Sequence, residues 1–133
     1  MAEAFICVIK MNGLKNDTDS VLAHCDIMID CLKNVAPCDR KRFTPEHIAS
    51  VESGCALGEF TKRDFVDCFS QLEGNECVAQ HFERFKTATR TSERCAILRD
   101  IDCVKKEVKK ICGEKDFWQF QIYVDKQNKI YKC

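Results

Sequence analysis

Cysteine is the residue type in this chain with the greatest capacity for chemistry, because eleven of its 133 residues are cysteines. This share, about 8%, lies at the lower edge of the range typical of disulfide scaffolds. No two cysteines form a Cys-x-x-Cys pair, the spacing with which structural zinc sites bring two sulfurs to one ion. Oxidation in pairs is the remaining chemistry, and it requires a secretory or extracellular compartment. The sequence therefore predicts a secreted protein held together by disulfide bonds.

The rest of the sequence predicts helices that would position these thiols. Only five Gly and two Pro occur, and apolar residues recur at spacings of three and four, as in amphipathic helices. The predicted helices begin near residues 20, 45, 61, 76, 92 and 117. We therefore expect an all-α fold, a disulfide-stapled bundle of about five to six helices. It would form a single domain over residues 20–133, after an N-terminal extension over residues 1–19.

Local signals predict where the first four helices begin or end. Pro37 is expected to stop the first helix near Val35, and Thr44 and Asn75 are expected to cap the second and fourth helices. Thr61 is followed three residues later by an acid, a variant of the capping box that predicts the start of the third helix.

The last two helices are less clearly delimited by the sequence. The fifth helix is expected to run unbroken to Gly113, a residue type that commonly ends helices. Polar residues alternate over residues 117–124, so this stretch fits either a helix or a strand. Its all-helical context favours a helix.

The spacing of cysteines along a helix limits how they can pair. With a rise of about 1.5 Å per residue, Cys95 and Cys103 would be roughly 12 Å apart, and Cys25 and Cys31 roughly 9 Å apart. A disulfide requires Cα atoms within about 7 Å. The bridges must therefore join different helices, while the connectivity stays open.

From Cys25 onward, the order of cysteines and aromatic residues resembles a nematode secreted family catalogued as domain of unknown function nineteen. The matching segments are Cys25-x5-Cys31-x6-Cys38, Glu59-Phe60, Phe65-Val66-Asp67-Cys68, Cys77 with Phe82, Cys95-x7-Cys103-Val104-Lys105-Lys106-Glu107, Cys112-Gly113, Trp118-x-Phe120 and the final Cys133. The resemblance implies a secreted, helical, disulfide-bonded protein of host–environment surfaces, without an established enzymatic activity.

The resemblance also separates one cysteine from the others. Cys7 lies before the matching segments, so we expect it to be the free thiol that an odd number of cysteines requires, in a monomer or a Cys7-linked dimer. The expected disulfide framework is Cys25, Cys31, Cys38, Cys55, Cys68, Cys77, Cys95, Cys103, Cys112 and Cys133. The sequon at Asn16 is a candidate glycosylation site and fits secretion.

The histidines offer two further chemical readings, which the cysteine content disfavours. Cys77 and His81 could share one helical face and a metal, and His24 could activate the thiolate of Cys25. Both readings need reduced cysteines, and His47 is better explained as part of a helix cap. The sequence contains no paired-carboxylate, phosphate-loop or nucleophile-elbow motif. We therefore expect no enzyme, no cofactor and no bound metal.

Charge and hydropathy narrow the range of partners. Basic and acidic residues balance at 21 each, which disfavours a nucleic-acid partner. No apolar run reaches the roughly 18 residues of a membrane span, and the run over residues 4–9 is too short for a signal peptide, as expected of a mature form. The basic loop 39–42 and the basic stripe Lys105, Lys106, Lys109 and Lys110 could meet an anionic glycan or membrane surface. A solvated helix face is the simpler explanation for them.

The aromatic residues leave two functions open. Nine phenylalanines and one tryptophan could line a pocket for a lipid between helices, but filling of the core explains them better. The core aromatics would be Phe60, Phe65, Phe69, Phe82, Phe85, Phe117, Trp118 and Phe120. We therefore expect a secreted, non-enzymatic interaction protein that binds an extracellular protein or glycan. The alternative is a small carrier of an apolar ligand.

Overall fold

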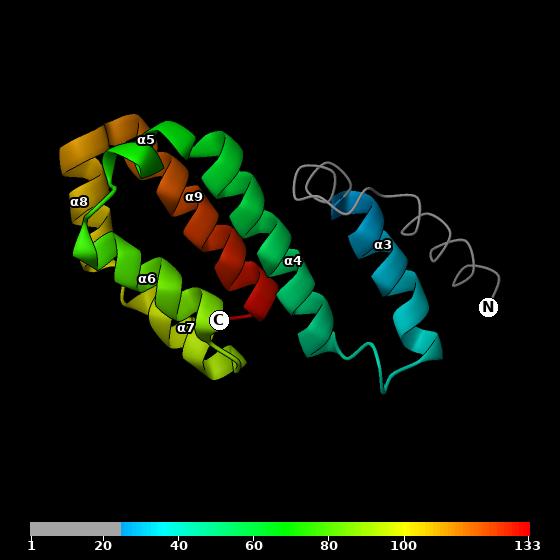
Figure 1. The fold of residues 1–133 in the computed structure, drawn as a ribbon. Coiled ribbons are helices and arrows are strands. Elements are labelled where there is room, and N and C mark those ends of the chain that lie inside the picture. The colour runs from blue at the N-terminus through cyan, green and yellow to red at the C-terminus, as the bar shows by residue number, and fades with distance from the viewer. Residues whose placement is uncertain (1–24) are drawn as a thin grey trace. The chain divides into compact units, whose positions relative to one another are not determined.

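The computed structural model describes residues 25–133, which form seven α-helices and no strand (Figure 1). This confirms the all-α class. The chain divides into two compact units, of which the first ends at Cys55 and the second begins at Ala56. The predicted boundary between residues 19 and 20 lies outside the described residues.

The described part of the first unit contains α3 (Cys25–Val35), a 3-10 turn over Ala36–Cys38 and the first part of α4 (Pro45–Glu59). Pro37 lies in the 3-10 turn, so α3 ends where the sequence predicts. Thr44 caps α4, because its Oγ1 accepts a hydrogen bond from the backbone N–H of His47 at 3.1 Å.

The disulfide Cys25–Cys55 joins α3 to α4, with Cα atoms 5.9 Å apart. Met28 and Ile29 pack against these two buried cysteines. An ion pair between Lys33 and Glu52, 2.9 Å long, adds a second link between the helices. The hydrogen bond from Lys33 to Glu52 raises the pKa of the lysine.

The third helix does not begin at Thr61, contrary to the capping-box prediction. The helical chain continues beyond Glu59 as a π-helical turn over Phe60–Asp64, and α5 (Val66–Gln71) begins after Phe65. The Thr61 hydroxyl donates to the carbonyl oxygen of Leu57 at 2.9 Å instead of capping a helix. The wide turn buries both Phe60 and Phe65 and stacks their rings with centroids 4.5 Å apart. Packing of these rings overrides the local cap signal.

The next helix, α6 (Glu76–Thr87), begins as predicted. Asn75 is its N-cap, and its Oδ1 accepts a hydrogen bond from the backbone N–H of Val78 at 3.1 Å. Gly74, just before the cap, has φ of 84°, a left-handed conformation that favours glycine.

The predicted fifth helix is two helices in the structure, α7 (Thr91–Arg99) and α8 (Asp102–Cys112). The chain leaves helical geometry at Asp100 and Ile101, and the Ile101 side chain is buried. Each of the two helices forms a disulfide with a different part of the chain. Cys95 of α7 is bonded to Cys133, and Cys103 of α8 is bonded to Cys77. The continuous apolar pattern across residues 92–112 contains no signal for this break.

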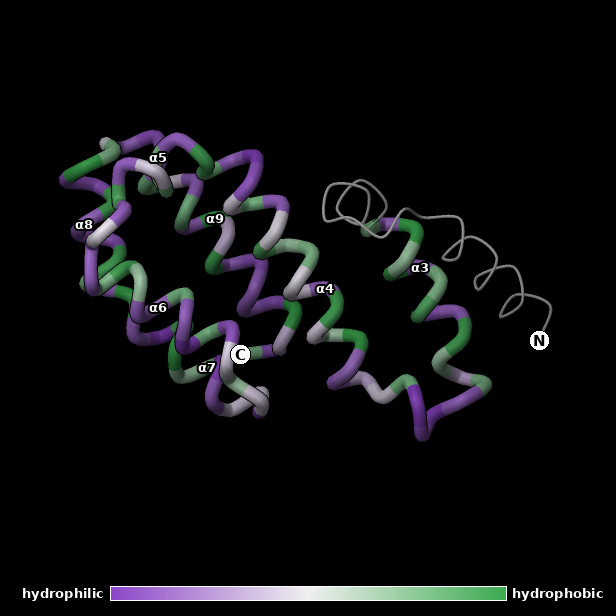
Figure 2. The backbone as a smooth tube through the Cα atoms, in the orientation of Figure 1, coloured by the Kyte–Doolittle hydropathy of each residue, from purple (hydrophilic) through white to green (hydrophobic). Residues whose placement is uncertain are grey.

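The final helix, α9 (Glu114–Tyr131), is longer than the predicted stretch 117–124, and it is a helix rather than a strand. Gly113 separates it from α8 with φ of 98°, a conformation open to glycine. In the second unit α7 and α8 both pack on α9, and α6 packs on α8 (Figure 1). Figure 2 shows hydrophilic and hydrophobic residues alternating along these helices, as the amphipathic pattern predicts.

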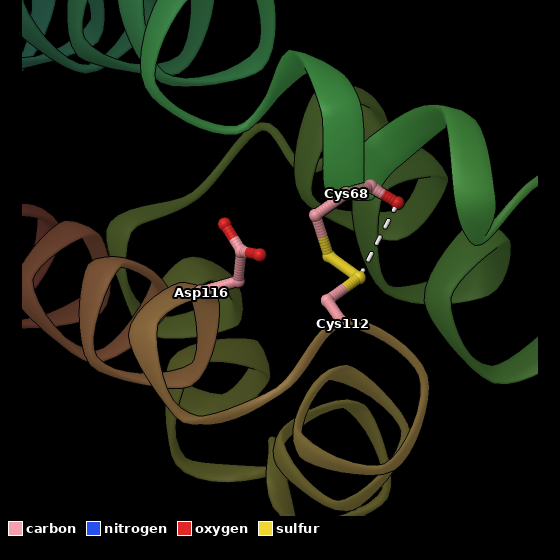
Figure 3. A group of neighbouring side chains, drawn as sticks. All are labelled: Cys68, Cys112 and Asp116. Carbon is pink, nitrogen blue, oxygen red and sulfur yellow. Dashed lines mark hydrogen bonds between the residues drawn. A yellow bond between two sulfur atoms is a disulfide. The ribbon is translucent and has the colours of Figure 1, made fainter.

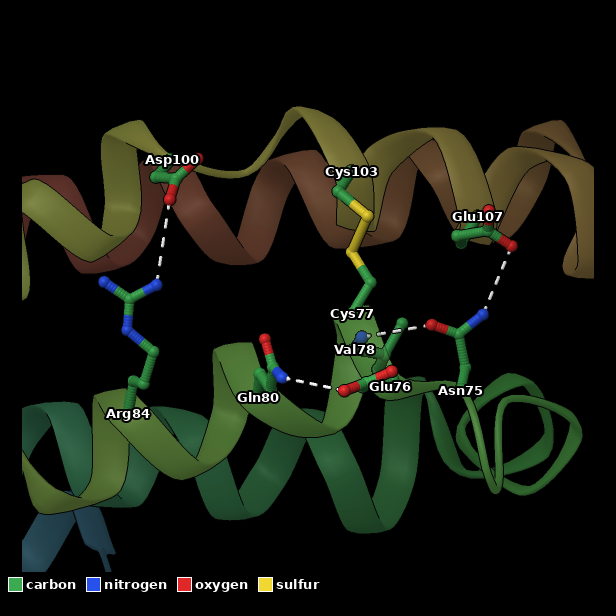
Figure 4. The surroundings of a disulfide bond; sticks show 9 residues. All are labelled: Asn75, Glu76, Cys77, Val78, Gln80, Arg84, Asp100, Cys103 and Glu107. Carbon is green, nitrogen blue, oxygen red and sulfur yellow. Dashed lines mark hydrogen bonds and ion pairs between the residues drawn. A yellow bond between two sulfur atoms is a disulfide. The ribbon is translucent and has the colours of Figure 1, made fainter.

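Three disulfides join the helices of the second unit. Cys68–Cys112 links α5 to α8, and Cys77–Cys103 links α6 to α8. Cys95–Cys133 links α7 to the C-terminal residue, which follows α9. The Cα–Cα distances of the three bridges are 5.5, 6.3 and 5.5 Å, in that order. Figure 4 shows the second bridge with the polar contacts beside it. These pairings confirm that cysteines sharing a predicted helix bond to other elements.

Cys38 is a free, exposed cysteine, so its predicted place in the disulfide framework is wrong. Pro37 ends α3 before Cys38, which therefore lies on an exposed turn rather than on a packed helix face. Cys31 is buried and disulfide-bonded.

Candidate functional site

The aromatic side chains of the second unit form a closed core. The Phe60 ring stacks on Tyr123 at 4.2 Å between centroids, and Phe65, Phe82 and Phe120 surround them. All five are at most 4% exposed. Burial raises the pKa of Tyr123, against the opposing effect of its hydrogen bond with Gln127. These rings pack against one another in a stacked arrangement, as in a closely packed interior.

The pockets described in the second unit lie at its surface. One, of about 330 Å³, is lined by Phe69, Leu72, Gly74 and Val78 together with neighbouring residues of α5 and α6. Its volume is at the lower limit for a small-molecule site, and Phe69 is 37% exposed. Phe69 was predicted to fill the core and instead borders this hollow.

His81 is buried in the same aromatic core. Its ring contacts the edges of Phe82 and Phe120, and Nδ1 has no hydrogen-bond partner in the part of the chain that is described. Its pKa is lowered to about 4, mainly by burial and also by the charge of Arg84, while the charge of Asp100 acts in the opposite direction. The neighbouring Cys77 is in a disulfide and cannot ligate a metal with His81.

The structure also bears on the predictions made for His24 and His47. Cys25 is disulfide-bonded and is not a thiolate, and its predicted activator His24 lies outside the described residues. His47 lies in the first turn of α4, where its backbone N–H joins the Thr44 cap and its ring is 6.3 Å from Phe43. This agrees with the structural role expected of it.

One group of potential metal ligands lies where α5, α8 and α9 meet. Cys68, Cys112 and Asp116 have ligand atoms within 4.8 Å of one another, and Figure 3 shows the Asp116 carboxylate beside the two sulfurs. The sulfurs are bonded to each other, however, and the Cys112 Sγ lies 3.6 Å from the Cys68 carbonyl oxygen. A disulfide sulfur lacks the thiolate charge that binds zinc, so the oxidised group does not fit a metal.

The outer face of α9 exposes two large apolar side chains. Trp118 is 58% exposed and Ile122 is 61% exposed, and their spacing of four residues places them on one helix face. Lys115 and Lys126 lie exposed one turn before and one turn after them. Trp118 was predicted to fill the core, and this prediction is wrong. The inward stripe of α9 is made instead by Phe120, Tyr123, Val124 and Tyr131.

A second surface, which we call the lysine–aromatic patch, joins α8 to α9. It consists of Lys105, Lys106, Lys109, Lys110, Phe117 and Trp118. The ammonium groups of Lys105 and Lys109 lie 5.7 and 5.5 Å from the centroid of the Phe117 ring. The Phe117 ring meets the Trp118 indole edge to face at 5.3 Å. The basic stripe of the sequence is therefore in contact with the half-buried Phe117, which lies beside the exposed Trp118. Helical spacing alone did not reveal this juxtaposition.

The second basic run lies in the first unit. Residues 39–42 are exposed, and the backbone N–H of Arg42 donates to Asp39 Oδ1 at 3.2 Å. Cys7 and Asn16, the predicted free thiol and glycosylation site, lie outside the described residues. None of the described helices is long and apolar enough to cross a membrane.

Together, the fold and its bridges define an all-helical, disulfide-bonded protein. The family model of DUF19, a domain of unknown function, matches residues 4–133, and the chain belongs to that family. The match includes Cys7, which the sequence reading had placed outside the family pattern. No curated protein and no solved structure matches the chain.

Proposed function

We propose that this protein is a secreted, non-enzymatic interaction protein that binds an extracellular protein or glycan through the outer face of α9. Secretion is supported by the number of disulfides, which persist in oxidising compartments. The nematode origin that the family resemblance implies is part of the same proposal.

The observation that carries the proposal is the exposure of Trp118 and Ile122. The second unit buries its other large aromatics in one core, apart from Phe69 and the half-buried Phe117. Tryptophan is enriched among residues that dominate binding energy at interfaces, and exposed apolar patches rimmed by charge mark interaction sites. Lys115 and Lys126 supply such a rim.

The competing function, a small carrier of an apolar ligand, has less support. The aromatic rings that could line a cavity are stacked on one another, as the 4.2 Å separation of Phe60 and Tyr123 shows. The pocket beside Phe69 is a feature that favours a carrier.

Capture from the extracellular fluid of the source organism tests the proposal. The immobilised wild-type protein and the variant Val66→Ala, which alters another exposed apolar residue, should retain the same binding partner. The double variant Trp118→Ala/Ile122→Ala should lose it at unchanged thermal stability. Equal retention by all three proteins would contradict the proposal. A stoichiometric lipid in the native mass spectrum would favour the carrier instead.

A further inference from the structure

The lysine–aromatic patch concentrates positive charge next to an exposed aromatic plane. Residues 105–110 read Lys-Lys-Glu-Val-Lys-Lys, a lysine-rich hexamer of the kind found in polyanion-binding patches. Lys106, Lys109 and Lys110 are exposed. None of the four lysines forms an ion pair with another residue of the described range, so residues 25–133 do not neutralise their charges through ion pairs.

The acidic residue inside the hexamer is directed elsewhere. Glu107 Oε2 accepts a hydrogen bond at 3.2 Å from the side chain of Asn75, the N-cap of α6 (Figure 4). The Asp116 carboxylate lies beside the Cys68–Cys112 bridge (Figure 3). Asp102 is exposed at the first turn of α8, at the opposite end from Lys109 and Lys110. Glu114, exposed in the first turn of α9, is the acidic residue that follows the end of α8, so four lysines still outnumber the acids over residues 105–114.

Two of the lysines, Lys105 and Lys109, contact the Phe117 ring. Both ammonium groups above the Phe117 ring gain a cation–π interaction, which limits the freedom of their side chains before any ligand binds. Pre-ordering of this kind lowers the entropic cost of association. The neighbouring Trp118 presents its indole to solvent at the edge of the same ring.

We propose that the lysine–aromatic patch binds an anionic polysaccharide. The lysine ammonium groups would contact its sulfate or carboxylate groups, and a sugar ring would lie against Trp118. This inference rests on the proposed function and specifies the partner as a glycan.

A polysaccharide fits this patch better than a membrane surface. Interfacial helices insert a continuous apolar face into the lipid, whereas the apolar stripe of α9 is buried in the core. Among the described residues of α9, the exposed large apolar side chains are those of Trp118 and Ile122. The balanced charge of the chain, 21 basic and 21 acidic residues, also argues against general nucleic-acid binding.

The fluorescence of Trp118 allows a direct test, because it is the one tryptophan of the chain. Titration of the full-length protein with heparin fragments at low salt should change its emission and saturate, and the affinity should fall as salt rises. Lys106→Gln/Lys110→Gln should weaken binding about tenfold, as loss of two exposed ionic contacts implies. The control Lys62→Gln/Lys86→Gln, which alters two exposed lysines elsewhere in the same unit, should bind like wild type.

Aromatic stacking is tested separately by elution from immobilised heparin. Trp118→Ala should elute at lower salt than wild type, and Trp118→Phe should elute between them. Equal elution of the lysine variants, or stronger binding to duplex DNA than to heparin, would overturn the inference. So would an emission change with phosphatidylserine vesicles but not with heparin, which would assign the patch to a membrane surface. If heparin fails while Trp118→Ala/Ile122→Ala still loses a captured protein, the proposed function stands and the glycan inference falls.

Discussion

At the scale of single residues, His81 and Cys38 differ most from the residues around them. His81 is a polar side chain in an apolar core, and Cys38 is a free thiol among disulfide-bonded cysteines. His81 is a polar ring enclosed by Phe82 and Phe120, without a partner for Nδ1 within the described residues. Burial therefore penalises its charged form, and this penalty appears as a pKa lowered to about 4. Cys38 is an exposed free thiol in a chain whose other described cysteines are oxidised.

The buried His81 predicts that acid destabilises the protein. Its pKa is about 4 in the fold and about 6.5 when unfolded, so the unfolded state binds the extra proton. The stability that comes from keeping His81 neutral is fully present above about pH 6.5 and is lost as the pH falls to about 4. The free energy of unfolding should fall by about 3 kcal/mol over this range. Chemical denaturation at several pH values should show this slope in wild type. In His81→Phe the slope should be smaller, and an unchanged slope would exclude His81 as its source.

The exposed thiol of Cys38 predicts a dimer that reducing agents dissociate. Wild type stored without reductant should show a disulfide-linked dimer on a non-reducing gel, and Cys38→Ser should abolish it. A surface substitution of this kind should change the free energy of unfolding by less than about 0.5 kcal/mol. The sequence reading assigned this role to Cys7. If Cys7→Ser abolishes the dimer and Cys38→Ser does not, that original assignment is the correct one.

At the scale of elements, signals carried by single residues predicted the helix ends, while packing decided the exceptions. Pro37, Thr44, Asn75 and Gly113 act where the sequence places them, because each limits the backbone locally. The π-helical turn at Phe60 and the break at Asp100 have no such local signal. They follow from ring stacking with Tyr123 and from two bridges that pull α7 and α8 to different partners.

The candidate surfaces could be predicted only in part. The four lysines of α8 stand out in the sequence, and their helical spacing predicts one basic stripe. Trp118 was placed in the core because residues 117–124 contain too many apolar residues to show which of them face inward. Its exposure depends on α9 turning Phe120 and Val124 towards the core, which is a property of the packed helices.

The bridge between α6 and α8 predicts a large effect of a single cysteine substitution. Cys103→Ser should cost roughly 2–5 kcal/mol, since it opens a loop closed by the Cys77–Cys103 bond and leaves Cys77 as a new thiol. Cys38→Ser is the matched control, because it changes the same atoms at an exposed site outside any bridge. Equal melting temperatures of the two variants would show that this bridge does not stabilise the fold.

At the scale of the whole molecule, disulfide bonds and a closed aromatic core act together. Bridges across sequence separations of 26 to 44 residues restrict the unfolded chain, and the stacked rings fill the interior of the second unit. Such a fold tolerates an exposed tryptophan and a cluster of four lysines that form no ion pair within residues 25–133. We therefore propose that surface residues, rather than an interior site, carry the function.

The central claim, an oxidised protein with one free thiol, is tested most directly by intact mass. The four described bridges and the bonded Cys31 amount to five disulfides, so the folded protein should be about 10 Da lighter than its fully reduced form. Treatment with iodoacetamide before reduction should add one label, which peptide mapping should place on Cys38. A folded protein with the fully reduced mass, or with labels on several cysteines, would contradict the disulfide framework and the secreted assignment built on it.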